Sequence, residues 1–236
     1  APVDRLRRLF ISETRSGTVA VVDTENFKVV DHLAAGKQPV RVALQPDGRF
    51  LWVGNNGGDE ASSGVTVIDV DEAKVVGFIP TGAGHHEIAF SADSRFAFVT
   101  NRQSGTLSVI DVSKRQVLKQ IATGPQPLSV GYSPLSQAVY VADGKEGQVS
   151  IIDANRHELT RKVALKPGLG PLRIAPNGRF ALVLNPREDL VHVLDTASQE
   201  AVHEIPVAGE PFQLNFTDTY AYVRSLHSER VSMINL

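Results

Sequence analysis

The sequence contains no cysteine, and only one methionine and one tryptophan occur among its 236 residues. Without cysteine the chain has no disulfide, no thiolate metal site and no covalently attached c-type haem. Its stability must therefore come from an apolar core, which a chain of this length can bury. This composition fits a secreted or periplasmic protein, although a cytosolic protein can also lack cysteine.

Concentrated charge and long apolar runs are absent as well. The chain carries 24 basic and 26 acidic residues, a formal net charge of -2, with no run of one sign. Nucleic-acid grooves and polybasic membrane patches both need concentrated positive charge, so neither is expected. No apolar run approaches the roughly 20 residues that a membrane-spanning helix requires. The sequence also lacks GxSxG, P-loop and dinucleotide-binding motifs.

What the sequence does contain is a repeat. Six copies each end in an apolar run followed by Asp or Asn, and successive ends are 46, 42, 42, 42 and 40 residues apart. A second landmark, an apolar segment such as LWVGN from Leu51 or FAFVT from Phe96, moves in the same register. The repeats end at Asp23, Asp69, Asp111, Asp153, Asp195 and Asn235.

One copy shows the structure of the unit. Alternating apolar residues predict strands at His86–Phe90, Arg95–Thr100 and Thr106–Ile110, and a fourth run follows at Gln116–Ala122. Short polar turns separate them, which indicates antiparallel hairpins. A period near 42 with four strands per copy is typical of β-propeller blades. The sequence therefore predicts an all-β fold, a β-propeller of four-stranded antiparallel blades.

The number of blades follows from the two ends of the repeat. The first copy starts at its second strand, Arg8–Ser12, and the last stops after its third, Val231–Leu236. We therefore expect four complete and two partial blades in a single propeller domain over residues 1–236. An open ring would expose apolar blade faces and strand edges. We expect an incomplete propeller, part of a ring of seven or eight blades; the alternative is a closed ring of six.

The first residues bear on localisation. The chain begins Ala1-Pro2-Val3 without an initiator methionine, and a small residue at position 1 is what signal-peptidase cleavage leaves. We expect a periplasmic or secreted protein.

The repeat resembles the YVTN-family β-propeller repeat. The resemblance rests on PDGRFLWVGN at Pro46–Asn55, SGTLSVID at Ser104–Asp111 and GPQP at Gly124–Pro127. Two further stretches, GHHEIAFSADSRFAFVTN and SLHSERVSMINL, resemble the cytochrome haem-d1-like subgroup. The resemblance implies the propeller fold. Because propellers carry out electron transfer, hydrolysis and scaffolding on one architecture, function depends on the site.

The first strand of each blade borders the central channel of a propeller, so binding residues are expected there. Because strand side chains alternate, the second and third residues of each aligned triplet face opposite ways. The second column is mainly apolar and is predicted to pack between blades, and the polar third column is predicted to line the channel. The triplets are Pro39-Val40-Arg41, His85-His86-Glu87, Pro127-Leu128-Ser129, Pro171-Leu172-Arg173 and Pro211-Phe212-Gln213.

The pair His85 and His86 is the exceptional part of this alignment, since His85 replaces the proline of the other copies. One hypothesis makes the pair a metal site, ligating haem iron or a divalent metal at the channel mouth, with Glu87 adding an oxygen ligand. The alternative is structural: His85 bonds the entry turn and His86 packs between blades. The cofactor-binding candidates are His85, His86, Glu87, Arg41, Arg173 and Gln213.

A second group of charged residues, Arg224, His227 and Arg230, follows the strand at Tyr220–Val223. It could clamp an anion, because arginine binds carboxylates bidentately. The alternative is a solvated surface turn.

Three functions remain open. The leading hypothesis is a non-enzymatic binding or scaffold module in a respiratory or metal-handling redox system, whose partner is another protein or the missing blades. The second is a redox protein that holds haem or copper at the channel mouth. The third is a lactonase-like hydrolase using Glu87, Arg41 and Arg173. The recurring aromatic residues are predicted to be core, and the recurring aspartates to cap turns.

Overall fold

The computed structural model describes residues 7–236, apart from the side chains of His85 and His86. The start of the chain, Ala1–Val3, on which the export prediction rests, lies outside the described residues. Regular structure in the described part consists of β-strands, with no α-helix.

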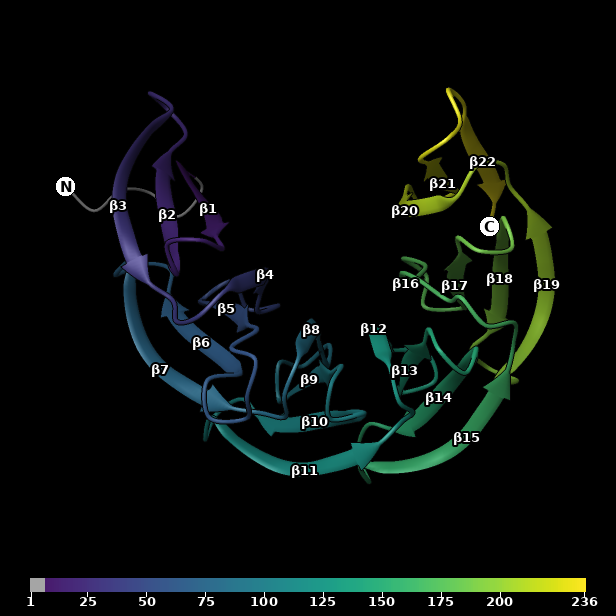
Figure 1. Ribbon diagram of the computed structural model, residues 1–236, viewed down its shortest axis with the longest axis horizontal. Coiled ribbons are helices and arrows are strands. Elements are labelled where there is room, and N and C mark those ends of the chain that lie inside the picture. The colour runs from purple at the N-terminus through teal and green to yellow at the C-terminus, as the bar shows by residue number, and fades with distance from the viewer. Residues whose placement is uncertain (1–6) are drawn as a thin grey trace. The chain divides into compact units, whose positions relative to one another are not determined.

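The strands form six sheets, called blades 1 to 6 in chain order, and each is an antiparallel meander of consecutive strands (Figure 1). Blade 1 contains β1 (Arg8–Glu13), β2 (Thr18–Asp23) and β3 (Lys28–Ala34). Blade 2 contains β4 (Pro39–Leu44), β5 (Phe50–Asn55), β6 (Gly64–Asp69) and β7 (Lys74–Pro80). Blade 3 contains β8 (His85–Phe90), β9 (Phe96–Asn101), β10 (Thr106–Asp111) and β11 (Gln116–Ala122).

The second half of the chain repeats this arrangement. Blade 4 contains β12 (Pro127–Ser133), β13 (Ala138–Asp143), β14 (Gln148–Asp153) and β15 (Glu158–Ala164). Blade 5 contains β16 (Leu172–Ile174), β17 (Phe180–Asn185), β18 (Leu190–Asp195) and β19 (Glu200–Pro206). Blade 6 contains β20 (Pro211–Phe216), β21 (Tyr220–Ser225) and β22 (Val231–Asn235). The described residues therefore form four complete blades and two blades of three strands, which confirms the predicted blade pattern.

The chain divides into two compact units. Unit 1 runs to Ser104 and includes Ser108–Gln120, and unit 2 comprises Gly105–Leu107 and Ile121–Leu236. In unit 1, Trp52 is fully buried and meets the ring of Phe90 edge to face, with centroids 5.3 Å apart. In unit 2, Tyr140 is fully buried within a cluster that joins blades 4 and 5. The prediction that the large aromatic residues belong to the core is confirmed for these positions.

The recurring aspartates cap turns, as predicted. In each case a carboxylate oxygen at the end of the third strand accepts hydrogen bonds from backbone N–H groups two or three residues later. The same turns place one residue in the left-handed region, with φ between 50° and 58°. That residue is Phe27, Ala73, Arg115, His157 and Gln199 in blades 1 to 5.

Candidate functional site

The first strands of the blades are not regular where the site was predicted. The register with the second strand shifts between Pro39 and Arg41, between Pro127 and Ser129, and between Pro211 and Gln213. In blade 3 the shift lies between His85 and Ile88. A bulge sets an extra residue against one partner residue, so side chains no longer alternate strictly across it. Strict alternation therefore does not determine which ways His86 and Glu87 face.

Cross-strand pairing also corrects one member of the polar column. Arg41 and Gln213 each lie opposite the fifth residue of the following strand. Arg173 lies opposite Leu182, the third residue of β17. It therefore matches Ala43 of β4, two positions further along, because β16 begins only at Leu172.

Ser129 does not line a channel. Its side chain is 2% exposed, and its Oγ lies 2.9 Å from the Leu172 N–H, whose hydrogen bond it accepts. It donates in turn to the Leu172 carbonyl at 3.1 Å. Ser129 therefore joins blade 4 to blade 5 within unit 2. Val40, expected to pack between blades, is instead 37% exposed, whereas Leu172 is fully buried as expected.

The remaining polar candidates differ in exposure. Arg41 and Gln213 are exposed, while Glu87 is only 8% exposed, and its backbone N–H donates to Thr100 Oγ1 at 3.0 Å. Arg173 is half-buried, and its Nη1 donates to the Leu172 carbonyl at 2.8 Å. Their assignment as cofactor-binding residues stays a prediction.

The metal hypothesis rests on side chains outside the described residues. The backbone of His85 pairs with Asn101 at the start of β8. Among the side chains that the structure does describe, no three His, Asp or Glu residues lie together as a metal site would require. Ligation by His85 and His86 stays a prediction.

The residue types around β8 include some that could hold a haem. In unit 1, β8 contacts β4. Arg41 on β4 lies opposite Gly54, the fifth residue of β5, and the Glu87 N–H on β8 donates to Oγ1 of Thr100, the fifth residue of β9. Imidazole is a ligand for haem iron, and a guanidinium binds carboxylates. Exposed aliphatic side chains lie on β4 and on β1, which contacts it. We call Leu9, Ile11, Val42 and Leu44 the apolar strip. These residue types fit a carboxylate-bearing macrocycle.

The charged group at the end of β21 and in the turn that follows it has local contacts. Arg224 lies over the Phe212 ring, 5.5 Å from its centroid. His227 Nδ1 lies 3.5 Å from Glu210 Oε2, and the Arg230 backbone N–H donates to Ser228 Oγ. This geometry favours the surface-turn interpretation over an anion clamp.

His192 on β18 is a fully buried histidine. Burial lowers the pKa of its imidazole below the ordinary value, and the Glu204 carboxylate, 3.3 Å from Nδ1, opposes that shift. The ring is therefore neutral near pH 7 and forms part of the core of unit 2.

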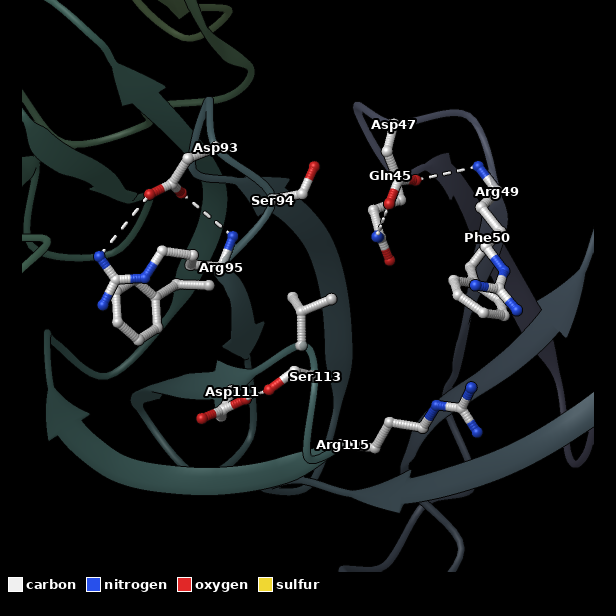
Figure 2. A pocket seen from close by; sticks show the side chains of 12 residues that line it. Gln45, Asp47, Arg49, Phe50, Asp93, Ser94, Arg95, Asp111, Ser113 and Arg115 are labelled. Atoms are coloured by element: carbon white, nitrogen blue, oxygen red, sulfur yellow. Dashed lines mark hydrogen bonds and ion pairs between the residues drawn. The ribbon is translucent and has the colours of Figure 1, made fainter.

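Sequence reasoning missed a pocket of about 560 Å³ in unit 1 (Figure 2). We call it the turn pocket, because the β4–β5, β8–β9 and β10–β11 turns line it. It lies at the ends of β4 and β8 that are opposite to Pro39 and His85. In Figure 2, Arg49, Phe50 and Arg115 lie on one side, and Asp93 and Arg95 lie on the other.

The only sequence signal for this pocket is a recurring Arg-Phe pair. It occurs at Arg49-Phe50, Arg95-Phe96 and Arg179-Phe180, and each arginine lies over the ring that follows it. The repetition indicates a structural turn. It does not reveal that two of these turns share a pocket with Arg115.

Comparisons with known proteins found similarity to one family model and to solved structures of the same fold. Residues 58–169 match the family model described as the cytochrome D1 heme domain. Hydrazine synthase of Kuenenia stuttgartiensis is 23% identical with a TM-score of 0.80, covering 97% of this chain and 73% of that one. Dihydro-heme d1 dehydrogenase NirN in complex with DHE is 20% identical with a TM-score of 0.80, covering 99% and 52%. The chain thus spans about half the length of NirN. A comparison with curated proteins gave no match.

At these identities the two structures show a shared fold, and the family match includes β8, the strand that carries His85, His86 and Glu87. No helix in residues 7–236 is long and apolar enough to cross a membrane. The fold is thus a β-propeller of four-stranded blades, and residues 58–169 are similar to the cytochrome D1 heme domain, which confirms the predicted resemblance to the haem-d1-like subgroup.

Proposed function

We propose that this propeller is a binding module in a periplasmic redox system, respiratory or metal-handling, and that it works as a non-enzymatic scaffold. The observation that carries the proposal is the apolar strip. Leu9, Ile11, Val42 and Leu44 are 51%, 45%, 39% and 55% exposed on two strands in contact. Exposed aliphatic side chains gathered in one place are typical of a surface that binds another surface.

The other blades indicate what covers such a strip. Ile88, Leu172 and Leu214 occupy the position of Val42 and are 9%, 0% and 5% exposed. Leu172 lies close to Gly131 on β12, the first strand of the preceding blade. The equivalent strand would pair with the edge of β1, on the side away from β2. We therefore expect a further β-sheet to cover the strip, supplied by additional blades of the same propeller or by a partner protein.

A double variant, Val42→Glu with Leu44→Glu, introduces negative charge into the apolar strip and tests this surface. Burial of a glutamate pair against another sheet is unfavourable, so the variant is expected to release the covering sheet in protein isolated with its partners. Light scattering after size exclusion measures the mass, and hydrogen exchange measures protection of the β1 amides. Val202→Glu, at a 42% exposed position on β19, is the matched control and should leave both unchanged. Unprotected β1 amides in the native assembly would refute the proposal.

A second candidate function, haem binding, is favoured by the match to the cytochrome D1 heme domain over residues 58–169. His85 or His86 would hold the iron, and Arg41 would bind a carboxylate of the macrocycle. Bound haem iron would supply one-electron chemistry. The chain's own residues would hold the group, and the apolar strip would offer it an apolar surface.

Haem titration followed by absorption spectroscopy tests this candidate. The protein is expected to shift the Soret band on binding, and His85→Ala with His86→Ala should abolish the shift. Arg41→Gln is expected to weaken binding about tenfold, since a charge-assisted bidentate hydrogen bond is lost. His203→Ala, on the exposed face of β19, is the control. If the double variant gave the same titration as the unchanged protein, ligation of haem by His85 and His86 would be refuted.

A further inference from the structure

The turn pocket carries three guanidinium groups and three carboxylates, and the two sets differ in how they are bound. Asp93 accepts hydrogen bonds from Ser91 Oγ at 2.7 Å and from the Arg95 N–H at 3.1 Å. Asp111 accepts them from Ser113 Oγ at 2.7 Å and from the Lys114 N–H at 2.9 Å. These hydrogen bonds keep the pKa of both carboxyls below the ordinary value. Both groups are thus ionised and are bound within their own turns.

Asp47 is bound in the same way. It accepts the Arg49 backbone N–H at 2.9 Å and Gln45 Nε2 at 2.6 Å. Gln45 is 4% exposed and also accepts the Trp52 indole N–H, at 3.2 Å. Asp47 is therefore held by a chain of hydrogen bonds that begins at the buried Trp52 and passes through Gln45.

The guanidinium groups, by contrast, keep most of their donors. Arg115 donates one hydrogen bond, from Nη1 to the Val76 carbonyl at 3.0 Å. The side chains of Arg49 and Arg95 are within 3.8 Å and 3.9 Å of Asp69 and Asp93, and neither donates a hydrogen bond to a described residue. A guanidinium has five N–H donors arranged to match an oxyanion. These donors are available to a ligand.

Two of the three cations share one aromatic ring. Arg49 Cζ is 4.8 Å and Arg115 Cζ is 5.1 Å from the centroid of Phe50, so the two Cζ atoms are less than 10 Å apart. Stacking on a ring restrains each guanidinium, and the two positive charges repel each other. An anion that contacts both would relieve this repulsion. The two arginine side chains, already restrained by the ring, would lose little entropy on binding it.

We propose that the turn pocket binds a small dianion, a dicarboxylate or a phosphate group, bridged by Arg49 and Arg115 with Arg95 on the opposite wall. Its volume lies within the range of small-molecule sites. The lining is rich in charge, which favours an oxyanion over an apolar ligand. The site shares no residue with the apolar strip or with His85, His86 and Arg41, so its test is independent of the proposed function.

Unit 2 contains a matched control for the site. Arg179 stacks on Phe180 at 5.0 Å and lies 3.6 Å from Asp195, which reproduces the turn of Arg49, Phe50 and Asp69. In the described residues, only one arginine lies over Phe180, whereas two lie over Phe50. A general attraction of anions to the turn would therefore involve Arg179 as much as Arg49.

Titrations with succinate, inorganic phosphate and acetate, followed by calorimetry and amide NMR shifts, test the proposal. Succinate or phosphate is expected to bind, shifting the amides of Arg49 and Arg115, and the tighter of the two identifies the source of the dianion. Arg115→Gln should weaken that binding about tenfold and Arg179→Gln less than about twofold. Arg115→Lys keeps the positive charge but not the planar set of guanidinium donors, so its loss of affinity should lie between the other two. This variant also shows whether misfolding explains the loss in Arg115→Gln. Lack of binding by both dianions, acetate binding as tight as theirs, or equal losses in Arg115→Gln and Arg179→Gln would overturn the proposal.

Discussion

Replacing Trp52 with alanine is expected to lower the free energy of unfolding by about 3–5 kcal/mol, the usual cost of removing a buried indole. Trp52 has no exposed surface and packs against Phe90 at the interface of blades 2 and 3. The small residue would leave a cavity and also remove the hydrogen bond to Gln45. Urea unfolding followed by circular dichroism measures the change, since Trp52 is the only tryptophan and its fluorescence is lost with it.

Two control variants separate the contributions. Trp52→Phe retains much of the volume and loses the indole N–H, so its cost should be smaller, about 1–3 kcal/mol. Phe27→Ala removes an aromatic side chain that is 82% exposed in the same unit and should change stability by less than about 0.5 kcal/mol. A Trp52→Ala protein as stable as Phe27→Ala would show that the contact between blades 2 and 3 contributes little.

Asp143 is expected to be the most sensitive polar position in unit 2. Its side chain is fully buried, Oδ2 accepts the Gln126 N–H at 2.6 Å, and Oδ1 accepts those of Lys145 and Glu146 at 3.0 and 2.8 Å. Asp143→Ala leaves three N–H groups without this acceptor and should destabilise the protein by about 3 kcal/mol, because hydrogen bonds to charged groups contribute more than neutral ones. Urea unfolding at neutral pH measures the loss.

The repeat itself supplies the control for Asp143. Asparagine ends the second strand of blades 2, 3 and 5, at Asn55, Asn101 and Asn185. Asp143→Asn keeps one acceptor oxygen and should cost about 1 kcal/mol. Asp218→Ala, at an exposed turn, should have almost no effect. A loss in Asp143→Asn equal to that in Asp143→Ala would mean that charge, and not the acceptor geometry, determines the stability.

Strands and turns could be predicted from the sequence because local chemistry determines them. The predicted run His86–Phe90 compares with β8 at His85–Phe90, and Arg95–Thr100 compares with β9 at Phe96–Asn101. Alternation of apolar residues and capping aspartates both act within a few residues of the chain. Such signals survive in each copy of the repeat.

The candidate site was less predictable because it depends on hydrogen-bond register. The segments Pro39-Val40-Arg41 and Pro171-Leu172-Arg173 look alike in sequence, yet Arg41 and Arg173 sit two positions apart in their ladders. A bulge shifts the register without any change in residue type. The turn pocket escaped prediction for a related reason, since Arg49 and Arg95 are brought together by packing of two blades across 46 residues of sequence.

The strand order within the blades has a consequence for folding kinetics. Each paired strand is joined to its partner by a short turn, so most ladders close loops of only a few residues. All-β proteins usually fold slowly because distant segments must meet before contacts compensate for the lost chain entropy. Here that cost is small within a blade and larger between blades. We expect single blades to form early, even while the rest of the chain is still being synthesised, and their mutual packing to limit the folding rate.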